Sequence, residues 1–252
     1  MKTKFLFSLT CLWAFLGCQA QTPSLENSTP LSAEPDYYYS PSSQEFFGAL
    51  LSWKVPYPRP GALSQADLES YQRSLKSADL YTDSRCKLDQ EDIESTVLQI
   101  SSKDREVCKG RHQQLIWLES TQGLYVCENG QIASAMRSAI GRGGLGKEKE
   151  GDNKNPVGSY WLGLPRPSER FGFFIPVGYP NKEDVKAGRT GHSIGIHGPL
   201  RKSFFGSPCG AGRNVNFNWT AGCTALGRDT QVVELSNWIV KNWPVQLHVL
   251  RD

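Results

Sequence analysis

Apolar positions in the first third of the chain, after residue 45, repeat at helical spacing. Ser64 followed by Asp67 has the form of a capping box, which marks the start of a helix. Four apolar side chains then follow on one helical face: Leu68, Tyr71, Leu75 and Ala78. A second, shorter pattern starts at Asp89 and Asp92 and carries three apolar residues: Ile93, Val97 and Ile100. We therefore predict a small helical module over residues 46–111, with a packing or positioning role.

From residue 112 onward the apolar period changes to two, which is typical of β-strands. The first three predicted strands cover residues 115–118, 124–127 and 131–140. Asn129-Gly130, between the second and third, is a strong signal for a tight hairpin turn. Residues 141–155 are rich in glycine and charge, and they predict a loop. Three more strands are expected, over residues 159–164, 193–196 and 245–249.

One good helix is expected near the C-terminus. Asp229 is a candidate N-cap, and Pro244 ends the pattern. The apolar face between them is formed by Val232, Leu235, Trp238 and Ile239. The pattern as a whole predicts a mostly β domain over residues 112–252, a sandwich or barrel with this one helix, preceded by the small helical module.

The first 17 residues have the pattern of a secretory signal peptide. Lys2 and Lys4 precede the apolar run 5–16, which is too short to span a bilayer. Residues 15–18 resemble a bacterial lipobox, which would make Cys18 the lipidated first residue of the mature protein. The alternative is cleavage by a general signal peptidase after Ala20.

The segment that follows, residues 18–45, is rich in proline, serine and threonine and predicts a flexible tether. Gln19 rather than aspartate follows the cysteine, which by resemblance to Gram-negative lipoproteins favours the outer membrane. We therefore expect a protein of the cell envelope that faces the periplasm and is held to the membrane by an N-terminal lipid.

Composition and net charge exclude some classes of binding partner. The formal net charge is +3, and Lys2 and Lys4 belong to the predicted signal peptide, so the remainder is nearly neutral. This excludes a strong electrostatic case for nucleic acid as a partner. After the leader, no stretch reaches the roughly 18 apolar residues that a membrane-spanning helix needs. The 24 glycines and 15 prolines favour a β protein rich in loops.

Seven cysteines give the first indication of chemistry. Two lie in the leader, and an odd number follows it: Cys86, Cys108, Cys127, Cys209 and Cys223. In an oxidising compartment at least one of these stays unpaired and is a candidate nucleophile. Proximity in the sequence makes Cys86–Cys108 a plausible bridge, although spacing alone does not fix connectivity. No pair has C-x-x-C spacing, so we predict no metal site and no cofactor.

Two residues stand where a catalytic pair is expected. Cys223 directly follows a glycine, in a predicted turn before a helix, where a thiol is exposed and backbone N–H groups can face a developing oxyanion. His197 ends a predicted strand, and an imidazole beside a thiol activates it for attack.

These motifs resemble the YkuD-type L,D-transpeptidase catalytic domain. That family carries His-Gly after a strand and then Ser/Thr-x-Gly-Cys, and here His197-Gly198 and Thr220-Ala221-Gly222-Cys223 stand in those places. Three earlier features match in the same order: Gly130, Gly141 and Pro156-Val157-Gly158. The resemblance covers roughly residues 114–252.

The sequence also departs from the family pattern. Residues 202–217 lengthen the interval between the histidine and the cysteine, and Asn155 stands where threonine is usual. Thr220 replaces the usual serine, and Ala225 stands where many members have arginine or asparagine. The end of the motif is more similar to the divergent YafK-like subgroup.

The resemblance implies acyl transfer on peptidoglycan stem peptides. Cys223 would form the thioester and His197 would act as the base, with the backbone N–H groups of Gly222 and Cys223 as the oxyanion hole. Expected substrate-binding residues are Thr220, Gly198, His192 and Trp219. The alternative for Thr220 is a hydroxyl that only steadies the turn, and the alternative for His192 is a structural histidine.

Three alternatives stay open at this point. The first is a hydrolase that cuts the same linkages, and the second is a non-catalytic wall-binding lipoprotein. A eukaryotic secreted protein, with Asn218-Trp219-Thr220 as a glycosylation site, is the third. The oligomeric state is not determined by the sequence.

Overall fold

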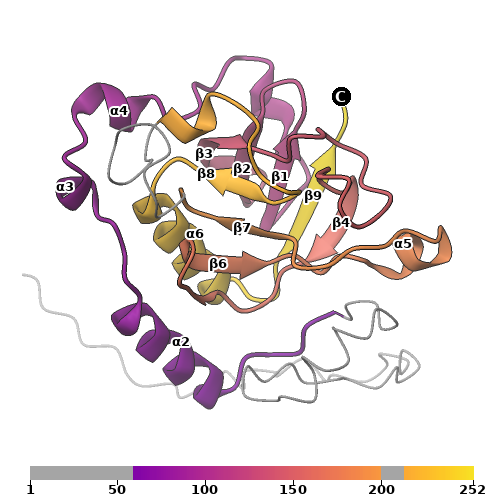
Figure 1. Ribbon diagram of the computed structural model, residues 1–252, viewed down its shortest axis with the longest axis horizontal. Coiled ribbons are helices and arrows are strands. Elements are labelled where there is room, and N and C mark those ends of the chain that lie inside the picture. Colours follow the sequence, from indigo (N-terminus) through magenta and orange to yellow (C-terminus); the bar gives the residue numbers. More distant parts are fainter. Residues whose placement is uncertain (1–58, 200–212) are drawn as a thin grey trace, which may run out of the picture. The chain divides into compact units, whose positions relative to one another are not determined.

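The structure of the protein is a computed structural model, which describes residues 59–199 and 213–252 (Figure 1). Nine strands form one sheet. They are β1 (Gln114–Leu118), β2 (Gly123–Glu128), β3 (Gln131–Ala139), β4 (Gly158–Trp161), β5 (Arg166–Ser168), β6 (Gly172–Pro176), β7 (Gly195–His197), β8 (Thr224–Leu226) and β9 (Gln246–Leu250). The helices are α2 (Gln65–Ser77), α3 (Asp83–Cys86), α4 (Gln90–Glu94), α5 (Lys182–Lys186) and α6 (Asp229–Lys241), with 3-10 turns η1 (Asp104–Glu106) and η2 (Arg213–Val215).

The sheet has the strand order β4-β9-β1-β2-β3-β8-β7-β6-β5. The pairs β1–β9 and β7–β8 are parallel, and the other neighbours are antiparallel. The sheet curls so that the chain after β4 meets β6 again, because the Gly163 N–H donates to the Pro176 carbonyl at 2.8 Å and the Gly178 N–H donates to the Trp161 carbonyl at 2.8 Å. The prediction of a mostly β fold with one C-terminal-region helix is confirmed.

The predicted hairpin joins β2 and β3. Asn129 and Gly130 both have positive φ, 52° and 81°, which is the backbone that a tight two-residue turn needs. β3 is the longest strand, and it links the two parts of the sheet. Its first residues pair with β2, whereas Ser138 and Ala139 pair with β8.

The main core fills the inside of the curled sheet, where α6 covers it. The buried face of α6 carries Val232, Leu235 and Ile239, as the apolar spacing predicted. The expected cap is wrong by one position. The N-cap is Arg228, and Asp229 is the first helical residue, whose carboxylate accepts the Tyr81 N–H at 2.7 Å.

The N-terminal helices follow the predicted pattern only in part. The capping box of α2 is present, with both the Ser64 and the Asp67 hydrogen bonds. The second helix is shorter than expected, because α4 ends at Glu94 and the next residues leave the helix to pair with the sheet. Val97 forms an isolated bridge with Met136, and the side chains of Val97 and Ile100 are exposed.

Residues 59–111 pack directly on the β domain. The Tyr71 hydroxyl donates to Asn237 of α6 at 2.7 Å, and the Gln231 amide donates to the Thr96 carbonyl at 3.0 Å. Tyr71 belongs to the main core, and its ring meets Phe173 edge-on at 6.1 Å. The boundary at residue 112 stays a prediction, since the two segments share one core.

The disulfide suggested by sequence proximity is wrong. Cys108 pairs with Cys127 of β2, and Cys86 is disulfide-bonded elsewhere. The reason lies in the second, outer face of the sheet, where the segment around residues 98–108 covers β1 and β2 and places Cys108 against Cys127. Within the described residues the free cysteine is Cys223.

In the β domain, three short strands and one short α-helix were not predicted: β5, β6, β8 and α5. β6 is buried at every position, so it shows no alternation, and β5 and β8 have only three residues each. The signal peptide, Cys18 and the tether lie outside the described residues. Over the part that the structure describes, none of the helices has the length and apolar character needed to cross a membrane.

Candidate active site

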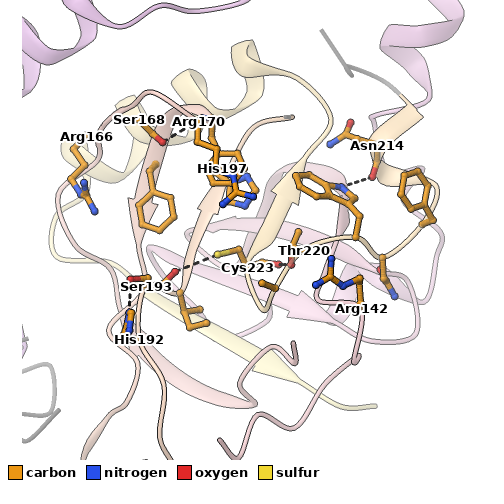
Figure 2. Close-up of a pocket in the computed structure, with 17 residues that line it drawn as sticks. Arg142, Arg166, Ser168, Arg170, His192, Ser193, His197, Asn214, Thr220 and Cys223 are labelled. Carbon is orange, nitrogen blue, oxygen red and sulfur yellow. Dashed lines mark hydrogen bonds between the residues drawn. The ribbon is translucent and has the colours of Figure 1, made fainter. Parts of the chain in front are cut away.

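A cavity of about 800 Å³ opens between β7, the turn that leads from β5 to β6, and the turn that precedes β8 (Figure 2). Five of the residues proposed from the sequence line it: Cys223, His197, Thr220, His192 and Trp219. Gly198 and Gly222 are buried and are not part of its lining. The structure thus brings the candidate nucleophile and the candidate base to one cavity, from β7 and from the start of β8.

His197 is held rigidly at the end of β7. Its side chain is 1% exposed, and its ring stacks on Phe171 with 3.7 Å between the centroids. Nδ1 lies 2.7 Å from the Gly198 carbonyl oxygen. A carbonyl only accepts, so Nδ1 carries the proton and Nε2 keeps its lone pair. Burial lowers the pKa of His197 to about 4, with the charge of Arg170 acting in the same direction against the Gly198 hydrogen bond.

Cys223 precedes the short strand β8, and not a helix as the sequence suggested. Its thiol donates to the Ser193 carbonyl at 3.5 Å, and the Gly195 N–H donates to the sulfur. Burial raises the pKa of Cys223 to about 11, against the opposing effects of that N–H and the positive charges of Lys147 and Arg170. In the free protein the pair is therefore a neutral thiol beside a neutral imidazole. If Cys223 is the nucleophile, attack requires that its proton be transferred, and His197 is the candidate acceptor.

The turn that carries the cysteine is braced by Thr220. The Thr220 hydroxyl donates to the Cys223 carbonyl at 2.6 Å and accepts the Gly222 N–H at 3.1 Å. Gly222 has φ 124°, and a Cβ there would lie 2.7 Å from the Lys154 carbonyl oxygen, so only glycine fits. Thr220 therefore steadies the turn, and in this arrangement the Gly222 N–H is already paired.

The loop of residues 141–155 packs against the turn that carries Cys223 and is hydrogen-bonded to it. Asn155 is buried and spans two partners, because its carbonyl accepts the Gly141 N–H at 2.7 Å and its amide donates to Thr224 at 3.1 Å. The Arg142 N–H also donates to the Thr220 carbonyl at 3.0 Å. Asparagine, the departure from the family pattern noted above, supplies both a donor and an acceptor at this position.

A buried ion pair holds the same loop together. Lys147 and Asp152 meet at 2.8 Å, and their side chains are only 3% and 9% exposed. Burial by itself would raise the pKa of Asp152, but Lys147 and the N–H groups of Glu148, Lys149 and Lys154 outweigh it and hold that pKa well below its usual range. This pair could not be predicted from the sequence, because nothing in a glycine-rich charged stretch indicates which charges are buried.

The opposite wall of the cavity is formed by residues 166–171, the β5 strand and the turn after it. Arg166 and Arg170 lie here, each within 5.3 Å of an aromatic ring centroid, those of Phe174 and Phe171 respectively. Arg142 lines the other side of the cavity. Among the residues that the structure describes, no aspartate or glutamate lines the cavity, so its charge is positive. Sequence reasoning missed all three arginines, since surface arginines in loops carry no periodic signal.

The other proposed residues have distinct surroundings. The His192 ring lies at the rim, 3.3 Å from Glu150 and 2.7 Å from the Ser193 hydroxyl. The Trp219 indole N–H donates to the Asn214 carbonyl at 3.0 Å, and its ring approaches His197 edge-on at 5.7 Å.

Gly198 allows close packing. A Cβ at this position would lie 2.5 Å from the Asp229 carboxylate, so the glycine lets β7 pass the start of α6. No cluster of three metal-ligating side chains occurs in the described ranges 59–199 and 213–252.

The sequence and the fold were compared with known families, curated proteins and solved structures. Residues 113–247 match the family described as the L,D-transpeptidase catalytic domain (YkuD). No curated protein matches the sequence. Solved structures that are similar include the helical cell shape determining protein Pgp2 from Campylobacter jejuni, at 25% identity over 65% of this chain and 56% of that chain, with a TM-score of 0.45.

Two further solved structures are more distant. Bd1075 from Bdellovibrio bacteriovorus is 19% identical over 62% of this chain and 52% of its own, with a TM-score of 0.39. An L,D-transpeptidase from Mycobacterium tuberculosis is 13% identical over 54% and 57%, with a TM-score of 0.34. The chain spans about half the length of these solved proteins. Because the family match covers more than half of the 252 residues, the chain belongs to the YkuD family of L,D-transpeptidase catalytic domains.

Proposed function

We propose that the protein is a cysteine-dependent acyltransferase that acts on peptidoglycan stem peptides, as an L,D-transpeptidase. One observation carries the proposal. His197 and Cys223 line the same cavity, and the Gly198 carbonyl fixes the imidazole proton on Nδ1, so Nε2 keeps the lone pair that a general base needs.

The first half-reaction forms a thioester. Cys223 attacks the carbonyl carbon between an L-centre and the terminal D-amino acid while its S–H proton passes to His197 Nε2. The new C–S bond replaces the C–N bond, and the imidazolium returns its proton to the departing amine. A neutral resting pair fits this sequence, because the low pKa of His197 makes its imidazolium a strong acid toward the leaving amine.

The oxyanion that forms during attack needs N–H donors. We assign this role to the N–H groups of Cys223 and Gly222. The Gly222 N–H is engaged by the Thr220 hydroxyl in the free protein, so it joins the hole only when that hydroxyl turns away. Thr220 therefore couples the turn geometry to the stabilisation of the intermediate.

The second half-reaction determines the product. An acceptor amine, such as a diaminopimelate side chain or a lysine on a protein, gives a proton to His197 Nε2 and attacks the thioester, and the thiol is regenerated. Water in the same place would make the protein a hydrolase. Trp219 and His192 line the cavity and are proposed to contact the peptide. Thr220 also lines the cavity and holds the Cys223 turn, whereas Gly198 lies behind the lining and allows close packing against Asp229.

The place of action follows from the substrate class. Peptidoglycan lies in the cell envelope, and we propose a periplasmic enzyme held to the outer membrane through a lipid on Cys18. The division into signal peptide 1–17, tether 18–45, helical module 46–111 and catalytic domain 112–252 belongs to this proposal, as does the similarity to the YafK-like subgroup.

The test is product analysis by mass spectrometry. Purified protein and its Cys223→Ala variant are incubated with peptidoglycan fragments, with and without an added D-amino acid. We expect a Cys223-dependent loss of a terminal D-residue, together with exchange or dimer formation. Loss or cleavage without exchange would make it a hydrolase, and identical spectra for the two proteins would contradict catalysis and favour a wall-binding lipoprotein.

A further inference from the structure

The cavity has a charge asymmetry that the acyl-transfer chemistry does not by itself require. Three arginines line it, and no acidic side chain of the described residues does. Figure 2 shows Cys223 and His197 with Arg166 and Arg170 toward one side and Arg142 toward the other. A positive cavity of this kind is suited to a ligand that carries carboxylates.

Arg170 lies near His197, the residue that is proposed to protonate the leaving group. Its guanidinium carbon is 5.3 Å from the centre of the Phe171 ring, and that ring stacks on His197 at 3.7 Å. Burial dominates the pKa of both His197 and Cys223, and the positive charge of Arg170 contributes a lowering effect to each. Arg170 is therefore the lining arginine associated with the atoms that transfer the proton.

Covalent geometry then places a carboxylate beside it. The departing amine must come within hydrogen-bond reach of His197 Nε2 to receive its proton. When the departing group is a terminal amino acid, its α-carboxylate is only two bonds from that amine, roughly 3 Å away by standard bond lengths. The carboxylate thus lies on the His197 side of the scissile bond, the side on which the exposed Arg170 lines the cavity.

We propose that Arg170, with Arg166 next to it on the same wall, forms a subsite for the free α-carboxylate of the departing residue. The enzyme then selects peptides whose scissile bond is the last one in the chain and discriminates against internal linkages. This inference rests on the proposed acyl transfer, and it specifies that reaction as one at a free C-terminus.

Arg142 offers a matched comparison within the same cavity. Its backbone follows Gly141, and its guanidinium donates to Asn153 at 3.1 Å, on the side of the cavity away from Arg170. It carries the same charge in the same pocket but is not placed to meet the departing residue. Removing it weakens binding of the peptide without changing the selection for a free C-terminus.

The experiment measures binding to the Cys223→Ala variant, which cannot turn over, by isothermal titration calorimetry. The two ligands are a stem tetrapeptide that ends in a free D-residue and the same peptide with a C-terminal carboxamide. We expect the acid to bind at least ~10-fold more tightly than the amide, the range expected for a hydrogen bond to a charged group. Equal binding of the two peptides, or no binding of either, would overturn the proposal.

Further substitutions in the Cys223→Ala protein show which arginine is responsible for the preference for the acid. Arg170→Gln and the Arg166→Gln/Arg170→Gln pair are expected to reduce the acid-to-amide ratio toward 1. Arg142→Gln is expected to weaken both peptides alike and keep the ratio, and Arg73→Gln, exposed on α2, controls for net charge. A ratio that survives in the Arg166/Arg170 double variant would contradict the assignment even if the acid is preferred.

Failure of the inference and failure of the proposed function give different results. A wild-type protein that releases the terminal residue but does not distinguish acid from amide retains the acyl-transfer function and loses the carboxylate subsite. A protein that prefers the acid through Arg170 but shows no Cys223-dependent product retains the subsite and loses the function.

Discussion

The two walls of the cavity are built in opposite ways. The 141–155 loop is held by buried polar groups, among them Asn155 and the Lys147–Asp152 pair. The wall formed by residues 166–171 presents Arg166 and Arg170, which are exposed and lie over aromatic rings. One wall fixes the turn that carries Cys223, whereas the other presents exposed charged side chains.

This difference teaches where each part of the function resides. On the 141–155 side the conformational entropy has already been lost during folding, so Cys223 is positioned before any substrate arrives. On the 166–171 side Arg170 is exposed, and binding of a ligand would order its side chain. Changes in the first wall should therefore affect stability and kcat, and changes in the second should affect KM.

The largest expected effect comes from replacing His197, the proposed catalytic base, which lies between the two walls. His197→Asn removes the group that accepts the thiol proton, so we expect kcat/KM to fall by about 100- to 10,000-fold. His248→Asn is the matched control, since His248 lies in β9 with its Nδ1 against Ser159 and away from the cavity. Steady-state kinetics on the stem peptide measure both. Equal losses in the two variants would remove the special role of His197.

The next effect tests the rigid wall. Lys147→Met leaves Asp152 buried without its partner, and breaking a buried pair in this way costs about 3–5 kcal/mol. The exposed pair Lys109–Glu106 provides the control, and Lys109→Met should change the free energy of unfolding by less than about 1 kcal/mol. Urea unfolding of both variants gives the comparison. A Lys147→Met protein as stable as the wild type would show that the loop does not depend on the pair.

A smaller effect is expected at Asn155. Asn155→Ala leaves the Gly141 N–H buried and unpaired and releases Thr224, with a cost of about 1–3 kcal/mol in unfolding free energy. Because the Cys223 turn loses a support, kcat should fall while KM changes little. Gln131→Ala, at an exposed position of β3, removes an amide without either consequence. A change in KM alone would place Asn155 in substrate binding.

The smallest effect is a pH dependence of stability. The pKa of His197 is about 4 in the folded protein, below the ordinary value of 6.5, so the unfolded chain binds its proton first as the pH falls. The stability linked to this residue is present above pH 6.5 and is lost between 6.5 and 4, by about 2 kcal/mol at pH 5.

Urea unfolding midpoints at pH 7 and pH 5, measured for the wild type and for His197→Asn, isolate the contribution of His197 to the pH dependence of stability. The wild type should lose the extra stability, and the variant should not. The shift in His248, which has the same direction, is common to both proteins and cancels in the difference. Parallel losses in the two proteins would show that His197 is not buried in its neutral form.

The sequence predicted those parts of the fold that have a regular period or a specific local signal. The β2–β3 hairpin, α2 with its capping box, α6 and β9 were all expected. Short strands were not predicted, because a strand of only three residues, such as β5 or β8, cannot show a period. The Cys108–Cys127 disulfide escaped because it depends on which segment covers the outer face of the sheet.

The site was predictable to a similar degree. Motif spacing brought out His197 and Cys223, and the structure places both at one cavity. The supporting residues Asn155 and Lys147, and the arginines of the opposite wall, come from loops whose folding depends on tertiary contacts. The paired Gly222 N–H was also beyond the sequence, since it depends on the rotamer of the Thr220 hydroxyl.

The most direct test of the account is the intact mass of the protein during turnover. Wild type is mixed with the stem tetrapeptide, quenched in acid within seconds and compared with Cys223→Ala. We predict an adduct with the mass of the peptide minus its terminal residue and one water, located on Cys223 by peptide mapping and absent from the variant. Turnover without an adduct on Cys223, or an adduct that persists in Cys223→Ala, would contradict the thioester mechanism.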